Sequence, residues 1–210
     1  MNTIENIAEF KDIFKEFQGL MMHYECAMLE VKTKLDVLNA ELAIRDSRNP
    51  FETIKTRIKK PMSIIDKLRR DGLEINIDNI RNNLNDVAGI RVICSFPDDI
   101  YKLADYLAAQ DDIKVIARKD YIANPKPNGY RSLHLIVEIP IFLTDEKKLM
   151  RVEVQFRTIA MMLGWLPVKR TVFIGISAPT ESFLLMMVAI RKVKIQVTSS
   201  SDNYLITSLC

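Results

Sequence analysis

Two stretches in the second half of the chain alternate between apolar side chains and side chains that are mostly polar. In residues 132–141 the apolar positions are Leu133, Leu135, Val137 and Ile139, and between them lie His134, Ile136 and Glu138. In residues 149–157 the apolar Val152, Val154 and Phe156 alternate with Arg151, Glu153, Gln155 and Arg157. Because successive side chains of a strand point to opposite faces, both stretches predict strands of a sheet with one dry face and one polar face. Helices must cover the dry face, and the polar face is left to meet a ligand.

The rest of the chain supplies helices and further strands around this pair. Residues 3–45 contain no proline and a single glycine, which predicts a helical segment broken near Gly19. An apolar stripe from Met21 to Leu42 suits core or oligomer contact. Helices are predicted at 61–70, about 77–84 and 98–109, and strands at 87–96 and 113–118. This order predicts an α+β (mixed α/β) domain, a mixed sheet flanked by helices with an N-terminal helical segment.

Composition excludes several classes of protein. The chain has 210 residues, 48% of them hydrophobic and 27% charged, which is typical of a globular protein. The net charge of +3 is too small to argue nucleic-acid binding from bulk electrostatics. Three cysteines lie far apart without metal-ligand spacing, which indicates free thiols in a reducing cytoplasm. We expect no signal peptide and no membrane span, since the apolar run 183–190 is too short.

The segment 118–134 enters and leaves strands through a loop rich in functional groups. Asn124-Pro125 and Asn128-Gly129 are turn dipeptides. The loop region also carries Lys126, Tyr130, Arg131 and His134. A basic loop with an aromatic ring suits a ligand that has phosphates and a stackable base. Taken alone, a solvated turn is the commoner interpretation.

Cations gather in a second region, residues 55–70. Ser63, Lys67 and Arg70 share one face of the predicted helix, and Arg57 and Lys59 of the extended lead-in point the same way. They indicate anion binding, with a solvated helix face as the alternative. Arg91 interrupts an apolar strand, where a cation is costly to bury, so we expect it to reach a cleft.

The predicted cleft contains two carboxylates among these cations. Asp86 and Glu153, with His134 and Gln155 near them, suit a divalent metal that bridges phosphate oxygens and a carboxylate that acts as a base. Phosphoryl-type transfer needs mainly positioning and charge neutralisation. The glycine-rich motifs of P-loop and Rossmann nucleotide sites are absent from the sequence. Taken singly, His134 is more often a structural histidine than a catalyst, and Glu153 is more often a surface acid.

Four blocks of sequence together resemble the synthetase domain of RelA/SpoT-type enzymes, most of all the stand-alone small alarmone synthetases. They are 57–70 (RIKKPMSIIDKLRR), 86–92 (DVAGIRV), 118–134 (RKDYIANPKPNGYRSLH) and 152–161 (VEVQFRTIAM). The resemblance covers about residues 50–161. It implies a nucleotidyltransferase-like fold and GTP diphosphokinase activity, the transfer of pyrophosphate from ATP to the ribose 3′-hydroxyl of GTP or GDP. The product would be (p)ppGpp, the alarmone of the stringent response.

The resemblance also implies a role for each motif residue. Arg57 and Arg91 would sandwich the adenine, and Lys59, Ser63, Lys67 and Arg70 would hold the ATP phosphates. Asp86 and Glu153 would bind Mg²⁺, with Glu153 also the base and Gln155 nearby. Tyr130 would stack on guanine, while Lys126 and His134 would contact the acceptor's phosphates. Relatives are cytoplasmic homotetramers, which implies a homo-oligomer, and (p)ppGpp or single-stranded RNA are candidate allosteric partners.

The resemblance ends abruptly at residue 161, which divides the chain into a helical segment 1–49, a synthetase domain 50–161 and an atypical tail 162–210. Acidic residues nearly vanish after Glu153, Met162 stands where a polar residue is expected, and Pro167 would interrupt a helix. We hypothesise that the tail is frameshifted or replaced. An alternative function is therefore a catalytically impaired relative that binds guanine nucleotides or single-stranded RNA. A different nucleotidyltransferase is a third interpretation.

Overall fold

The computed structural model describes residues 2–46, 48–163, 198–200 and 203–205. The chain divides into two units, Met1–Trp165 and Leu166–Cys210. In the second unit the described part is an antiparallel hairpin of β6 (Thr198–Ser200) and β7 (Asn203–Leu205). Apart from residues 162 and 163, which end a helix, the rest of the tail lies outside the described residues. Its origin therefore stays a hypothesis, and the boundaries at 49 and 161 stay predictions.

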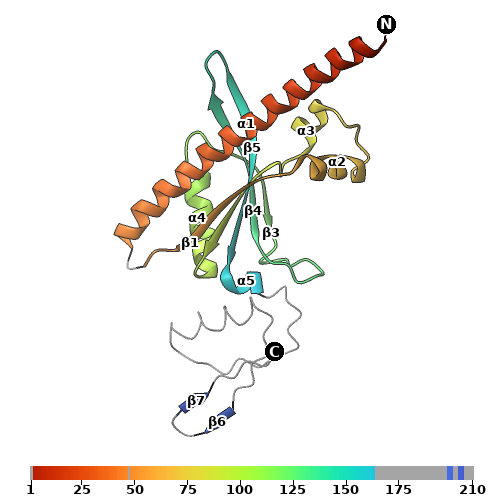
Figure 1. The fold of residues 1–210 in the computed structure, drawn as a ribbon. Helices are drawn as coiled ribbons and strands as arrows, with labels where there is room; N and C mark the ends of the chain where they lie inside the picture. The colour runs from red at the N-terminus through yellow and green to blue at the C-terminus, as the bar shows by residue number, and fades with distance from the viewer. Residues whose placement is uncertain (1, 47, 164–197, 201–202, 206–210) are drawn as a thin grey trace. The chain divides into compact units, whose positions relative to one another are not determined.

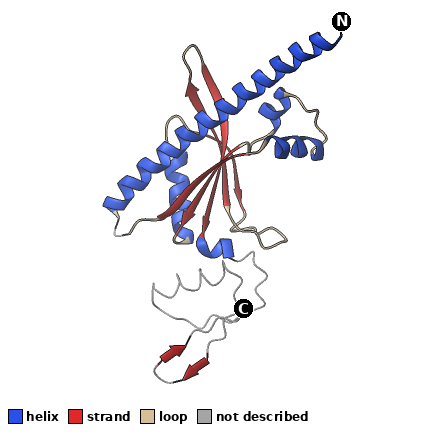
Figure 2. Ribbon diagram, viewed as in Figure 1, coloured by secondary structure: helices blue, strands red, loops and turns tan. Residues whose placement is uncertain are grey.

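The first unit is built on a mixed five-stranded sheet, which confirms the predicted α+β class (Figure 2). Its strands are β1 (Phe51–Ile58), β2 (Ala88–Cys94), β3 (Lys114–Asp120), β4 (Leu133–Phe142) and β5 (Lys147–Thr158). They lie in the order β1-β2-β5-β4-β3. The pair β2–β5 is parallel and the other neighbours are antiparallel.

Strand β1 was expected only as an extended lead-in to a helix. Instead it pairs antiparallel with β2, from Phe51 opposite Cys94 to Ile58 opposite Ala88. Most side chains of this edge strand are exposed or half-buried, so it lacks the apolar signal that marks a central strand. The pairing places Arg57 on the sheet itself.

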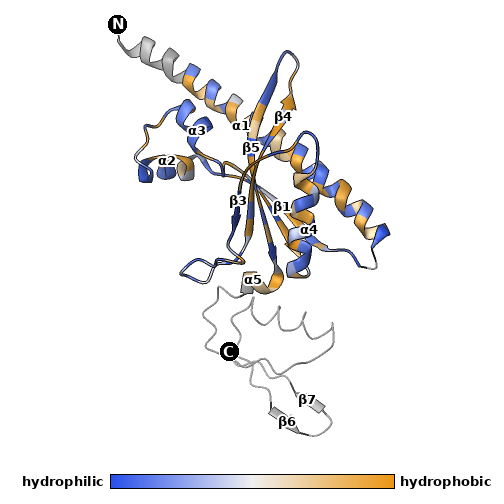
Figure 3. Cartoon of the chain, turned by 180° about the vertical axis from the view of Figure 1, so that it is seen from behind, coloured by the Kyte–Doolittle hydropathy of each residue, from blue (hydrophilic) through white to orange (hydrophobic). Residues whose placement is uncertain are grey.

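One face of the sheet is dry, as predicted, and two helices cover it. Helix α1 (Asn2–Arg45) runs diagonally across the strands (Figure 1), and α4 (Pro97–Ala108) packs on the same core. Fully buried on this face are Leu133, Leu135, Val137, Ile139, Val152, Val154 and Phe156 from the strands, and Ile100, Leu103, Ala104 and Leu107 from α4. Figure 3 shows hydrophobic and hydrophilic residues alternating along both helices, as one-sided burial requires.

The apolar stripe of α1 belongs to this core. Tyr24, Val31, Leu35 and Leu42 are at most 2% exposed. Each fully buried large apolar side chain contributes about 1.5–3 kcal/mol to folding. Of the two uses predicted for the stripe, the structure therefore shows core contact.

The predicted break of the first helix near Gly19 is wrong. Helix α1 is continuous from Asn2 to Arg45, with Gly19 inside it. A glycine in a helix interior costs only about 0.5–1 kcal/mol relative to alanine. Burial of the stripe on the C-terminal side of Gly19, from Leu20 onward, outweighs that cost.

The remaining helices flank the sheet. They are α2 (Pro61–Arg70), α3 (Ile77–Asn83) and α5 (Ile159–Leu163). Helix α4 begins at Pro97, and Asp99 caps it from the first turn by accepting a hydrogen bond of 3.2 Å from the Phe96 N–H. Within the described ranges, no helix is long and apolar enough to cross a membrane.

Candidate active site

Strand register sets out the polar face of the sheet as rows of side chains. One row reads, from β1 to β4, Lys55, Arg91, Gln155 and His134. The next row reads Arg57, Gly89, Glu153 and Ile136. Residues far apart in the sequence, such as Arg91 and Gln155, thus become neighbours, because four strands present them to the same side.

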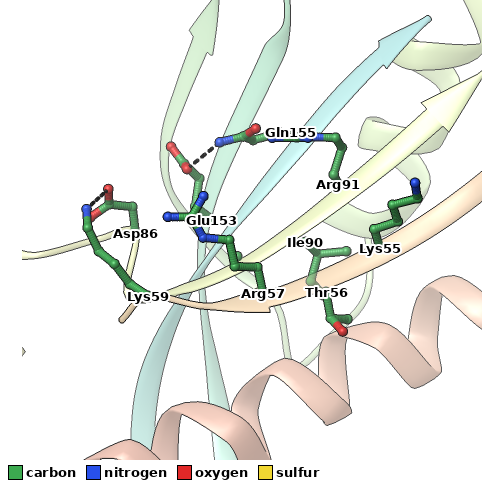
Figure 4. A pocket seen from close by; sticks show the side chains of 10 residues that line it. Lys55, Thr56, Arg57, Lys59, Asp86, Ile90, Arg91, Glu153 and Gln155 are labelled. Carbon is green, nitrogen blue, oxygen red and sulfur yellow. Dashed lines mark hydrogen bonds and ion pairs between the residues drawn. The ribbon is translucent and has the colours of Figure 1, made fainter. Parts of the chain in front are cut away.

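A pocket of about 300 Å³ opens over these rows. Its lining residues are Lys55, Thr56, Arg57, Lys59, Asp86, Gly89, Ile90, Arg91, Glu153 and Gln155 (Figure 4). Six of the site residues expected from the sequence are among them. Arg91 reaches the pocket as predicted, and its Nε is buried without a protein partner. Gly89, which lacks a side chain, leaves the floor between Arg57 and Glu153 open.

Asp86 is held by two lysines. Lys59 Nζ donates to Oδ2 and Lys67 Nζ to Oδ1, each at 2.7 Å. Burial raises the pKa of Asp86, but the two ammonium groups outweigh burial and leave that pKa below its ordinary value. Asp86 is therefore ionised at neutral pH. In this structure the lysines expected to hold phosphates hold a carboxylate.

Glu153 also receives two donors. Its Oε1 lies 2.9 Å from His134 Nδ1, and its Oε2 accepts a hydrogen bond of 2.8 Å from Gln155 Nε2. Burial raises the pKa of Glu153, yet the hydrogen bonds from His134 and Gln155 bring it below the ordinary value. An ionised, oriented carboxylate facing a pocket suits a general base.

Helix α2 brings one of its three predicted contacts to this site. Lys67 reaches Asp86, whereas Ser63 is half-buried and Arg70 is exposed, and neither of these two lines the pocket. Their convergence on one ligand stays a prediction.

The loop after β3 forms a cluster of rings and cations beside the pocket. Lys126 Nζ lies 4.5 Å from the centroid of the Tyr121 ring and 5.4 Å from that of Tyr130. The Tyr130 hydroxyl lies 2.8 Å from His134 Nε2. The loop is fixed by Gly129, which has φ +79° and donates to the Lys126 carbonyl at 2.8 Å.

Sequence reasoning missed two members of this cluster, Tyr121 and Arg157. The Arg157 guanidinium lies 4.7 Å from the centroid of the Tyr130 ring, and the residue is only 8% exposed. Burial lowers the pKa of Arg157 from its ordinary value, with Arg91 acting in the same direction. The alternation of β5 already placed Arg157 on the polar face, and that signal could have included it.

The carboxylates fit a magnesium ion only with help from a substrate. The described residues hold no cluster of three or more His, Cys, Asp or Glu side chains that could bind a metal alone. Asp86 and Glu153 are both ionised and line one pocket. Mg²⁺ is commonly bound by one or two carboxylates together with substrate phosphates, so this donor set suits it.

Comparison with known proteins decides the family. The model of the region found in RelA/SpoT proteins matches residues 56–164, about half of the chain. The chain belongs to the RelA/SpoT family. The match begins within β1 and ends after β5, so it contains every pocket residue except Lys55.

Two curated RelA/SpoT relatives come from Bacillus subtilis (strain 168). The chain is 38% identical to the GTP pyrophosphokinase YwaC over 159 residues, which is 76% of each chain. It is 35% identical to the GTP pyrophosphokinase YjbM over 147 residues, 70% of this chain and 68% of the relative.

Solved structures of small alarmone synthetases share the fold. Synthetase 2 from Bacillus subtilis superposes with a TM-score of 0.62 at 39% identity, covering 70% of this chain and 74% of that one. Synthetase 1 from the same organism, bound to its product pppGpp, gives 0.65 at 35% identity with the same coverage.

Proposed function

We propose that this chain transfers pyrophosphate from ATP to the ribose 3′-hydroxyl of GTP or GDP, as a GTP diphosphokinase that makes (p)ppGpp. The observation that carries the proposal is Glu153, an ionised carboxylate with two fixed donors at the floor of a strongly cationic pocket. The relatives named GTP pyrophosphokinase, and the related synthetase bound to pppGpp, support the same reaction.

In the reaction Glu153 would accept the proton of the acceptor's 3′-hydroxyl. The oxygen then attacks the β-phosphorus of ATP, the bond from that phosphorus to the bridging oxygen of the α-phosphate breaks, and AMP leaves. Negative charge grows on the phosphate oxygens, and the pocket cations stabilise it without rearranging. The chain's contribution is therefore orientation, charge and one base.

The donor side of the pocket suits ATP. Arg57 and Arg91 lie on adjacent strands with planar guanidinium groups, which can stack on both sides of an adenine. Lys59 and Lys67 would exchange Asp86 for phosphate oxygens when the nucleotide binds. Ser63 and Arg70 extend this phosphate surface along α2. A relative's structure holds AMPCPP, an ATP analogue, which supports a donor nucleotide here.

The acceptor side of the site is the cluster of rings and cations in the loop after β3. Tyr130 would stack on guanine, and Lys126, poised between two rings, would contact the acceptor's phosphates. Gln155 lies beside Glu153 and would orient the ribose. Mg²⁺, held by Asp86, Glu153 and the phosphates, would neutralise charge on the transferred group.

Assembly, regulation and location are further proposals. We expect a homo-oligomer, with (p)ppGpp or single-stranded RNA as candidate regulators, in a reducing cytoplasm. Cys26 and Cys94 are free thiols in the described part of the chain, in line with such a compartment. Light scattering with and without each ligand measures the assembly directly.

Replacing Glu153 tests the assignment of the base. We expect Glu153→Gln, which keeps the size but removes the charge and one acceptor oxygen, to lower turnover by roughly 10²–10⁴-fold. Binding of ATP should change little, because the amide leaves the pocket cations in place. Turnover of labelled ATP with GDP and Mg²⁺, beside ATP titration of the same preparation, separates the two effects. Full activity of this variant would contradict the assignment.

A further inference from the structure

His134 joins the acceptor loop to the base. Its Nε2 lies 2.8 Å from the Tyr130 hydroxyl and its Nδ1 lies 2.9 Å from Glu153 Oε1. The ring is only 7% exposed. The Tyr121 and Tyr130 rings contact it edge-on, with centroids at 5.2 Å and 5.8 Å, so its plane is fixed.

The two contacts determine which nitrogen carries the proton in a neutral imidazole. An ionised carboxylate can only accept, so Nδ1 must donate to Glu153. Nε2 then has a lone pair, which accepts from the Tyr130 hydroxyl. The carboxylate thus selects the tautomer, and the Tyr130 hydroxyl, which can donate to Nε2, holds the ring in that state.

The resemblance gave His134 a different task, contact with the acceptor's phosphates. Both of its nitrogens are engaged within the protein and its surface is nearly covered. A direct contact with phosphate would require breaking one of these hydrogen bonds. Lys126, which is exposed, can reach a phosphate without that loss.

We propose that His134 is a positioning residue, which couples the ring that receives the acceptor to the orientation of Glu153. The proposal rests on the proposed function, in which Glu153 is the base. When the loop is in place, Tyr130 fixes His134 and His134 fixes Oε1, while Gln155 fixes Oε2. Loss of the Tyr130 hydroxyl therefore disturbs the base without removing the ring on which guanine would stack.

Two substitutions of His134 provide a matched pair. The amide nitrogen of asparagine lies near the position of Nδ1, whereas that of glutamine lies near the position of Nε2. We expect His134→Asn to recover most of the kcat lost in His134→Ala, and His134→Gln to recover little. Tyr130→Phe should lower kcat roughly 10-fold and leave KM for GDP within about 2-fold, since orientation of a base acts on the chemical step.

The kinetic constants distinguish positioning from structural support. In His134→Ala and His134→Gln the loss should fall on kcat with KM for GDP nearly unchanged, because the lost donor orients the base and does not bind the acceptor. His134→Asn should keep most of kcat, with the same KM. Equal behaviour of all three variants would overturn the proposal, as would a rise in KM for GDP with kcat unchanged, which would mark a phosphate contact.

A measurement on the full chain without turnover keeps this proposal separate from the proposed function. The chain has two histidines, so ¹⁵N spectra of histidine-labelled protein are simple, and His23→Gln assigns them. We expect the Nδ1-protonated tautomer at His134, and a shift of its Nε2 resonance in Tyr130→Phe. The opposite tautomer would overturn the positioning role, whereas an inactive chain with the expected tautomer would overturn only the proposed function.

Discussion

Asp86 is a residue whose charge contributes to folding. One half-buried carboxylate forms ion pairs with both Lys59 and Lys67, whose side chains are 12% and 24% exposed. Arg57 and Arg91 line the same pocket. Without the carboxylate, two partly desolvated ammonium groups would face each other next to further cations.

We therefore predict that Asp86→Asn lowers the free energy of unfolding by about 1–3 kcal/mol, because two charge-assisted hydrogen bonds lose their anion. The control is Asp105→Asn. Its partner Arg118 lies at 2.6 Å, but the two side chains are 61% and 40% exposed, so the loss should stay below about 0.5 kcal/mol. Urea denaturation of both variants gives the comparison, and an Asp86→Asn chain as stable as the parent would refute it.

Acid titration of the same variants tests the direction in which stability changes with pH. Since the pKa of Asp86 lies below its ordinary value in the folded chain, Asp86 stabilises the fold above that ordinary value, about 3.8. The stabilisation is lost as pH falls through the lowered folded pKa. Asp86→Asn should therefore flatten the acid end of the stability curve, and Asp105→Asn should not.

At the residue scale the sequence predicted six of the residues that line the pocket, but not their hydrogen-bond partners. Strand period brought Glu153 and Gln155 to one face, whereas Asp86, which precedes β2, was placed by its motif. The partners of His134 were not predictable from spacing. They depend on how the chain turns between Tyr130 and His134 and on the register of β4 with β5. Only the folded chain defines these two features.

At the scale of elements, two glycines show how context reverses the effect of one substitution. Gly19 lies within α1, and a Cβ built there meets nothing within 4 Å. Gly72 follows the end of α2 at φ +70°, in the left-handed region. There the Leu73 N–H donates to the Leu68 carbonyl at 2.9 Å and ends the helix.

We predict that Gly19→Ala raises the free energy of unfolding by about 0.5–1 kcal/mol, because it removes backbone freedom from the unfolded chain without a clash. The same change at Gly72 should lower it by about 1 kcal/mol or more, since alanine is strained at positive φ. Thermal unfolding of the two variants tests the pair. A destabilised Gly19→Ala chain would argue against a continuous α1.

The elements themselves were predictable where a side-chain period was strong. The strands at 132–141 and 149–157 and the helices at 61–70 and 77–84 are present within a few residues of their predicted ends. Strand β1 was missed because an edge strand buries few of its side chains. The break at Gly19 was wrong because tertiary burial overrides a small local cost.

At the scale of the molecule, the same strands form the core on one face of the sheet and the site on the other. Residues 152, 154 and 156 bury a core under α1 and α4, while 153, 155 and 157 face the pocket and the ring cluster. A shift of one residue in the register of β5 would exchange the two sets of side chains. The register that buries the core therefore also places the site residues. The resemblance in sequence followed this division, because its motifs lie on the polar face, on α2 and on the loops beside them.

The central claim is the transfer of an intact pyrophosphate, and the nucleotide released from ATP tests it most directly. The full chain with ATP, GDP and Mg²⁺ should release one AMP for each GDP consumed, and the new ³¹P signals should include a phosphate coupled to the ribose H3′. Release of ADP, or a product phosphorylated only at its existing phosphate chain, would contradict the account.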